Sequence, residues 1–151
     1  METHVRVLEE LGSEAARFVS TLAPHTNHAT VVLLSGDLGA GKTAFTKEIA
    51  RALGVDEVVN SPTFVLEKIY SLDAAQDKQQ TRGFSRLIHI DAYRLEGREE
   101  LAPLAFEEFL RDPENLIIVE WPEQVGLTEL SPATLVSIER LPDESRTITY
   151  G

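Results

Sequence analysis

A glycine-rich segment that follows a short apolar run constrains the fold of this chain more than any other feature. The segment has the spacing Gly-x-x-x-x-Gly-Lys-Thr from Gly36 to Thr43, and the apolar run covers residues 31–34. Apolar residues then recur at helical spacing over residues 44–53, and Gly54 ends this pattern. A buried strand, a glycine-rich loop and a helix in this order predict a loop that binds the phosphates of a nucleoside triphosphate. A glycine-rich turn that matches by chance is the alternative, and it does not account for both flanking elements.

Two residues at the end of this loop have the side chains that phosphate chemistry needs. Glycines let the backbone curl so that successive N–H groups point at the phosphates, and the following helix adds its positive end. Lys42 is expected to reach the β- and γ-phosphates, and the Thr43 hydroxyl is expected to bind Mg²⁺. The loop therefore predicts a site for a nucleoside triphosphate and Mg²⁺.

The composition indicates one small domain over residues 1–151. With 151 residues, 42% of them hydrophobic, the chain can bury roughly two-thirds of its unfolded surface in one core. The first residues lack the basic and apolar regions of a signal peptide, and no apolar run reaches the roughly 20 residues of a membrane span. The absence of cysteine excludes disulfides and thiolate metal sites and is compatible with a reducing cytosol. We therefore expect a cytoplasmic protein without a membrane partner.

The formal net charge of −11 argues against tight binding to nucleic acid. Such binding depends on lysine and arginine side chains that replace the counterions of the phosphate backbone. Ten of the fourteen basic residues are arginine, so a local basic patch is not excluded. We expect little direct nucleic-acid binding.

Strand and helix patterns alternate along the chain, which predicts an α/β fold. The last two predicted strands are expected to pair antiparallel around Pro142 and to close one edge of the sheet. The predicted strands lie near residues 5–7 and at residues 31–34, 65–70, 87–91, 116–120, 134–138 and 146–150. The predicted helices cover residues 13–22, with Ser13 as the cap, 44–53, and 99–110, with a break near Pro103. Residues 71–85 are polar and unpatterned, which is typical of a long loop or a hairpin tip.

Two predicted strands end in a carboxylate, at Asp91 and at Glu120. Because parallel strands end at the edge where a phosphate loop opens, both acids can reach Mg²⁺ or an attacking water. Carboxylates that merely face solvent at a strand exit are the alternative, and two of them beside such a loop favour function. His89 shares a strand face with Asp91, and no further histidine is near it in the sequence. We interpret His89 as a hydrogen-bonded partner that orients a neighbouring side chain, not as a metal ligand.

A second segment follows the first predicted helix and contains Ser61, Pro62 and Thr63. Proline makes the preceding residue extended and stiffens the turn, so Thr63 is a candidate hydroxyl for a switch that senses the γ-phosphate. An ordinary turn before a strand explains the same residues. The only tryptophan, Trp121, directly follows Glu120 and is expected to be a core or rim aromatic, with a place beside the nucleotide as the alternative.

Four segments in a fixed order together resemble the TsaE family, the small ATPases of bacterial tRNA threonylcarbamoyladenosine biosynthesis. The segments are GDLGAGKT at 36–43, SPTF at 61–64, HIDAYRL at 89–95 and VEWP at 119–122. The resemblance covers about residues 31–125, and it implies a P-loop NTPase fold with a mostly parallel sheet flanked by helices. It also implies ATP hydrolysis that supports the TsaB–TsaD complex, which modifies adenosine 37 of tRNAs that read codons beginning with A.

The resemblance also implies roles for single residues. It places Mg²⁺ on Thr43 and Glu120, and it makes Asp91 the catalytic acid beside the catalytic Lys42. Ala44 stands where relatives often have a second threonine, so it offers a backbone N–H and no hydroxyl. The residues implied at the nucleotide are Asp37, Leu38, Gly39, Ala40, Gly41, Lys42, Thr43, Ala44 and Thr63. Glu14 and Arg146 are further candidates near the nucleotide, to which no role is assigned.

Two alternatives to a partner-dependent ATPase remain open at this point. A small-molecule kinase needs arginines on a lid, and residues 77–86 hold Lys78, Arg82 and Arg86, although no acceptor pocket is recognisable. A regulatory module that binds ATP without useful turnover is the other alternative. A GTPase is disfavoured because the chain lacks an Asn-Lys-x-Asp segment that reads guanine.

Overall fold

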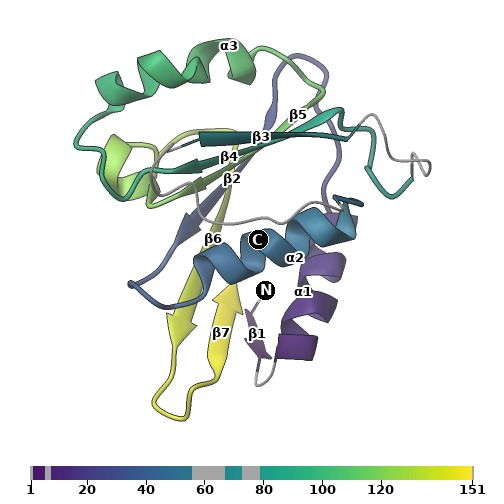
Figure 1. Cartoon of the computed structure of the whole chain (residues 1–151), viewed down its shortest axis with the longest axis vertical. Coiled ribbons are helices and arrows are strands. Elements are labelled where there is room, and N and C mark those ends of the chain that lie inside the picture. Colours follow the sequence, from purple (N-terminus) through teal and green to yellow (C-terminus); the bar gives the residue numbers. More distant parts are fainter. Residues whose placement is uncertain (1, 6–7, 56–66, 73–78, 151) are drawn as a thin grey trace.

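The computed structural model describes residues 2–5, 8–55, 67–72 and 79–150, and its centre is a seven-stranded sheet (Figure 1). The strand order is β1-β7-β6-β2-β5-β4-β3. The strands are β1 (Glu2–Val5), β2 (Thr30–Ser35), β3 (Glu67–Ser71), β4 (Arg86–Asp91), β5 (Asn115–Glu120), β6 (Thr134–Arg140) and β7 (Arg146–Thr149). This sheet confirms the predicted α/β architecture.

The four central strands β4, β5, β2 and β6 run parallel, and antiparallel strands flank them. At one edge β3 pairs with β4, and at the other β1 and β7 continue from β6. Antiparallel pairing therefore occurs on both sides of the sheet. The predicted β6–β7 pair lies on one side, and the β3–β4 pair forms the opposite edge. The parallel strands bring Leu34 opposite Glu120, and Glu120 opposite Asp91, at their carboxyl ends.

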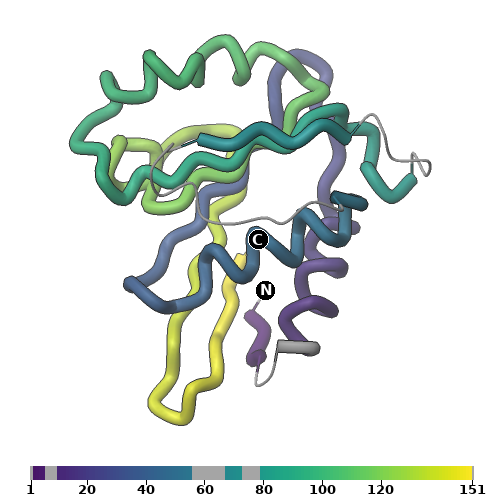
Figure 2. The backbone as a smooth tube through the Cα atoms, viewed as in Figure 1, coloured from purple at the N-terminus to yellow at the C-terminus, as the bar shows by residue number. Residues whose placement is uncertain are grey.

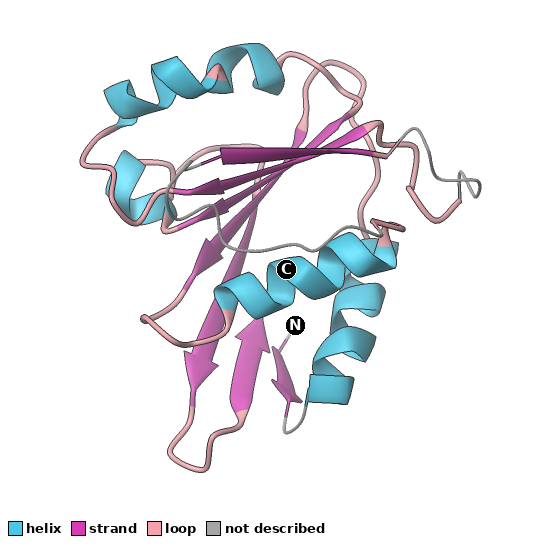
Figure 3. Ribbon diagram, in the orientation of Figure 1, coloured by secondary structure: helices cyan, strands magenta, loops and turns pink. Residues whose placement is uncertain are grey.

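Helices cover both faces of the sheet (Figure 3). The helices α1 (Leu8–Ser20) and α2 (Lys42–Ala52) pack on one face, where Phe18, Phe45 and Leu34 belong to one core cluster. The 3₁₀ helix η1 (Arg98–Leu104) and the helix α3 (Phe106–Leu110) pack on the other face, and a second 3₁₀ helix, η2 (Pro122–Val125), follows β5. Burial on both faces explains why β2 and β5 carry unbroken apolar runs instead of alternating ones. None of the described helices has the length and the apolar character needed to cross a membrane.

Helix α1 begins at Leu8, five residues before the predicted cap at Ser13. Gly12 lies inside the helix, where its missing side chain leaves room for Glu48 of α2. A Cβ atom at Gly12 would lie 3.1 Å from the Glu48 carboxylate of that helix. The predicted break in the 99–110 helix is confirmed, since Ala105 adopts φ 59° between η1 and α3.

The first and the last strand lie side by side, as the tube in Figure 2 shows. Glu2 is opposite Thr149 in this antiparallel pair. The predicted strand at residues 65–70 is described from Glu67 to Ser71, and residues 73–78 of the predicted 71–85 loop lie outside the described residues.

Candidate phosphate-binding site

The glycine-rich segment forms the loop between β2 and α2, and its glycines are there for their backbone conformation. Gly36, Gly39 and Gly41 have φ values of 155°, 80° and 110°, which side chains rarely allow. A Cβ atom at Gly36 would also lie 2.4 Å from the carbonyl oxygen of Ile138 on β6. The loop is therefore both curled and pressed against a neighbouring strand.

Lys42 bends back over this loop. Its Nζ donates to the carbonyl oxygens of Gly36 at 2.5 Å and Asp37 at 3.0 Å, and the side chain is buried. Burial lowers the pKa of Lys42, and the carboxylates of Glu120 and its neighbours oppose that shift. A buried ammonium group among carbonyl oxygens is well placed to exchange them for phosphate oxygens.

The Thr43 hydroxyl and the Glu120 carboxylate meet at the start of α2. The hydroxyl lies 3.0 Å from one carboxylate oxygen and 3.2 Å from the other. Glu120 is only 2% exposed, and its Oε2 also makes a short hydrogen bond to Nε2 of His89. The interpretation of His89 as a hydrogen-bonded partner of a neighbour is confirmed.

Thr43 and Glu120 fit a magnesium ion, judged by the chemistry of their side chains. A hydroxyl and a carboxylate are hard oxygen ligands, and Mg²⁺ commonly uses one or two of these with phosphate oxygens and water. Within the described part of the chain, no group of three or more His, Cys, Asp or Glu side chains could hold a metal. Magnesium at this site would therefore depend on the phosphates of the nucleotide.

Asp91 lies next to Glu120 across the β4–β5 pair and stays partly exposed. Its carboxylate accepts the backbone N–H of Tyr93 at 3.0 Å, which fixes it at the exit of the strand. Both acids thus end at the edge where the loop opens, as the sequence predicts. Glu120 is buried against the threonine, and Asp91 faces the open space.

A pocket of about 380 Å³ joins these groups. It is lined by residues of the loop, of α2 and of the segments that follow β4 and β5: Leu38, Gly39, Gly41, Lys42, Thr43, Ala44, Asp91, Tyr93, Arg94, Glu120 and Trp121. Of the described residues predicted at the nucleotide, Asp37 and Ala40 belong to the same loop and do not line this pocket. Thr63 and its predicted switch segment lie outside the described residues.

Trp121 forms part of the pocket wall. It adopts φ 59°, and its backbone N–H donates to the carbonyl oxygen of Leu34 at 3.1 Å. Its ring centroid lies 4.9 Å from that of Tyr93. The Nζ of Lys42 sits 3.9 Å from the indole ring, close enough for a cation–π contact. The tryptophan is a rim aromatic that lies at the pocket itself.

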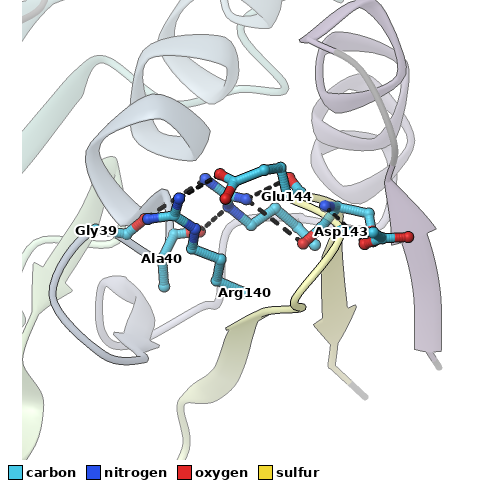
Figure 4. A network of polar contacts seen from close by, with 7 residues as sticks. Gly39, Ala40, Arg140, Asp143 and Glu144 are labelled. Carbon is cyan, nitrogen blue, oxygen red and sulfur yellow. Dashed lines mark hydrogen bonds and ion pairs between the residues drawn. The ribbon is translucent and has the colours of Figure 1, made fainter.

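Figure 4 shows Gly39 and Ala40 of the loop beside Arg140 and Glu144 of the β6–β7 hairpin. Arg146 of this hairpin supports the loop from outside. Its Nε donates to the carbonyl oxygen of Ala40 at 2.7 Å, and its other nitrogens reach the carbonyls of Gly39 and Glu144. The resemblance implies no role for Arg146, and the sequence alone does not reveal this contact because it joins residues 106 positions apart. The loop glycines indicate that some neighbour must hold the outward carbonyls, but the sequence does not say which.

Glu14, the other candidate without a role, lies elsewhere in the fold. It is buried between the hydroxyl of Tyr150, which donates at 2.8 Å, and the guanidinium of Arg17. These contacts join α1 to the end of the chain after β7, and the pocket residues do not include Glu14.

The arginines of the predicted kinase lid lie far from the loop in the fold. Arg82 donates to the carbonyl oxygens of Leu22 and Ser20 at the end of α1. Arg86 begins β4 and binds Asp112, so it lies at the amino end of the parallel strands. Lys78 is outside the described residues. Arg82 and Arg86 fasten the fold at the edge opposite the phosphate loop.

The fold and this site define a P-loop protein of the α/β class. A crystal structure of Bacillus subtilis YdiB superposes with a TM-score of 0.74 at 27% sequence identity and covers 99% of this chain and 83% of that one. The sequence model described as "Threonylcarbamoyl adenosine biosynthesis protein TsaE" matches residues 10–148. The chain belongs to the TsaE family.

Curated relatives carry the same name, tRNA threonylcarbamoyladenosine biosynthesis protein TsaE. The protein from Bacillus subtilis is 36% identical over 120 residues, which are 80% of this chain and 68% of that protein. The protein from Treponema pallidum is 32% identical over 148 residues, which are 97% of this chain and 100% of that protein. The family therefore places the chain in tRNA threonylcarbamoyladenosine biosynthesis, as the resemblance implied.

Proposed function

We propose that this protein binds ATP with Mg²⁺ and hydrolyses it to support the TsaB–TsaD complex during threonylcarbamoylation of adenosine 37 in tRNAs that read codons beginning with A. The observation that carries the proposal is the contact of 3.0 Å between the Thr43 hydroxyl and the Glu120 carboxylate beside a buried Lys42. These three groups converge at the carboxyl end of the parallel sheet, where α/β proteins bind ligands. The cytoplasm, where tRNA is modified, is the expected location.

Each residue has a defined part in this proposal. The N–H groups of the loop and the ammonium of Lys42 bind the phosphates, and Thr43 with Glu120 holds the metal ion. Magnesium, when bound, neutralises the charge that develops on the transferred phosphoryl group. Asp91 is partly exposed, and its carboxylate accepts a hydrogen bond of 3.0 Å from the backbone N–H of Tyr93. From this position it orients the attacking water. Thr63 is proposed as the switch residue that contacts the γ-phosphate.

A partner protein is proposed as the target of this chemistry because the pocket has little room for a second substrate. Its volume of about 380 Å³ is shared among the phosphate loop, both acids and the aromatic rim. The net charge of −11 also argues against direct capture of tRNA. ATP binding and hydrolysis would act by favouring one of two states of the partner complex.

Reconstitution with purified components tests the proposal. Phosphate release is measured for the protein alone and with TsaB and TsaD, and tRNA modification is followed over many cycles. We expect weak turnover alone, stimulation by the two partners, and modification that stops early without this protein. Equal multi-cycle modification without it would contradict the proposal. ATP binding without any phosphate release would instead favour the regulatory-module alternative.

A further inference from the structure

His89 occupies a core position in the middle of the sheet although its side chain is polar. The imidazole is 0% exposed, on β4, and on the same face as Leu87, whose side chain belongs to the α1–α2 core cluster. Its partner in register on β5, Ile118, is a member of that cluster too. An apolar side chain would complete this layer, so packing alone does not explain a histidine here.

The hydrogen bonds of His89 are incomplete. Its Nε2 binds Oε2 of Glu120, whereas Nδ1 is buried without a hydrogen-bond partner among the described residues. A buried polar atom without a partner costs about 1–3 kcal/mol of stability. The histidine therefore lowers the stability of the core, and its one hydrogen bond must be considered for a role other than stability.

That one hydrogen bond acts on the orientation of Glu120. A carboxylate oxygen accepts hydrogen bonds, so the imidazole donates from Nε2 to Oε2 and holds that oxygen toward β4. Thr43 approaches the same carboxylate from the side of the loop, at 3.0 Å and 3.2 Å. The carboxylate is thus fixed from behind by β4 while its front faces the position where phosphates and metal are proposed to meet.

We propose that His89 is a positioning residue that orients Glu120 for Mg²⁺, an inference that rests on the proposed binding of Mg²⁺ and ATP. It acts through Glu120 and does not bind the metal itself, because the imidazole is fully buried and its Nε2 is already used. Groups that orient a metal ligand commonly change metal affinity by 10–100-fold when they are removed. The unpaired Nδ1 is the stability cost of this arrangement.

The test compares two substitutions that differ in a single hydrogen bond. His89→Leu removes the donor and restores an apolar core, and His89→Gln keeps an N–H at nearly the distance of Nε2. Ile118→Val is the matched control, since it removes one methyl group from the same layer and leaves the bond to Glu120 intact. Binding of ATP is measured by calorimetry in EDTA and over a Mg²⁺ titration, with the melting temperature of each variant as a check on folding.

We expect His89→Leu to need about tenfold more Mg²⁺ for half-maximal enhancement of ATP binding, with ATP affinity in EDTA unchanged within about threefold. His89→Gln and Ile118→Val should stay near the parent protein. A purely structural role would weaken binding in EDTA as well, and would not be rescued by glutamine. If His89→Leu does not fold, His89→Asn, whose amide is too short to reach Glu120, takes its place with the same expected loss.

Two contradicting outcomes are distinct. In the first, Mg²⁺ strengthens ATP binding by the parent protein, and His89→Leu needs no more Mg²⁺ than the parent. This result would overturn the role of His89 and leave the proposed function standing. A parent protein whose ATP binding ignores Mg²⁺ would overturn the proposed function, and the role of His89 with it.

Discussion

The two ends of the parallel strands use charged residues in opposite ways. At the amino end, Arg86 donates to Asp112 at 3.1 Å and to Asn115 at 2.9 Å, and the two ionic side chains stay about 40% exposed. At the carboxyl end, Lys42 and Glu120 are almost fully buried, 5% and 2% exposed. Charges that stay near water form pairs at small cost, whereas buried charges cost stability unless a ligand or partner compensates.

This difference separates residues that stabilise the fold from residues that are proposed to bind a ligand. Both ends have arginine or lysine near carboxylates, so the sequence alone does not tell them apart. At the amino end Arg86 binds Asp112 and Asn115. The carboxyl end holds the buried ammonium group of Lys42, and below it the Nδ1 atom of His89 has no hydrogen-bond partner among the described residues. Substitutions at the two ends should therefore affect different measurements.

The largest expected effect is that of Lys42→Ala at the carboxyl end. Loss of the ammonium group should lower ATP binding or turnover by about 100-fold or more, because it removes a charge directed at the phosphates. The melting temperature should not fall, since the buried charge itself is a cost to the fold. Lys47→Ala on the same helix is the control, and its residue does not line the pocket. Unchanged ATP hydrolysis in Lys42→Ala would remove the phosphate loop from the mechanism.

The two acids at the carboxyl end should differ from each other. Glu120→Ala is expected to weaken Mg²⁺-dependent ATP affinity by roughly 10–100-fold, because a metal ligand stabilises the bound ground state. Asp91→Ala should keep most of that affinity and lose most of the hydrolysis, because it acts chiefly in the transition state. Mg²⁺ titrations of bound ATP and single-turnover hydrolysis measure the two effects. The reverse pattern would exchange the two assignments.

A moderate effect on stability alone is expected at the amino end, from Arg86→Ala. It leaves the buried Asn115 without its donor, so the free energy of unfolding should fall by about 1–2 kcal/mol. ATP hydrolysis should stay within about twofold of the parent protein. Urea titrations measure the free energy of unfolding of each variant. Arg98→Ala, which breaks an exposed pair with Glu107 at 3.3 Å, should lower that free energy by about 0.5 kcal/mol or less. A large loss of phosphoryl transfer in Arg86→Ala would revive the kinase alternative.

The sequence predicted the carboxyl end better than it predicted the partners of each residue there. The positions of the loop, Asp91 and Glu120 follow from apolar runs that end in polar residues, and a parallel sheet places such ends together. The support of the loop by Arg146 was not predictable, because it depends on β6 lying beside β2. The true start of α1 was missed because Ser13 is a good capping residue, while the packing of Gly12 against Glu48, which favours helix before Ser13, is a tertiary effect.

A small, pH-dependent effect is expected for Glu67 on the edge strand β3, opposite Ile90 at the carboxyl end. Burial raises the pKa of Glu67 to about 7 from 4.5, and its Oε2 has no hydrogen-bond partner in the described part of the chain. The folded protein keeps a proton there that the unfolded chain releases, so stability should fall as the pH rises from about 4.5 to about 7. Glu67→Gln should remove that slope and add roughly 1 kcal/mol above pH 7, discounted for the partial exposure of the side chain.

Urea unfolding of both proteins at pH 5 and pH 8 measures this difference. Glu108→Gln on the exposed side of α3 is the control and should leave the slope unchanged. Equal pH slopes in the parent protein and Glu67→Gln would mean that burial does not raise the pKa of Glu67, and that this carboxyl group does not destabilise the carboxyl end.

The position of Arg146 has a consequence for the order in which the protein is made. A ribosome that adds roughly 5–20 residues per second needs roughly 5–20 seconds to pass from Ala40 to the arginine that holds its carbonyl, 106 residues later. The interval is longer still for the strand β1, because its pairing partner β7 is made near the end of synthesis. A nascent chain therefore carries the whole Gly-x-x-x-x-Gly-Lys-Thr sequence well before the neighbour that holds its carbonyl groups has been made.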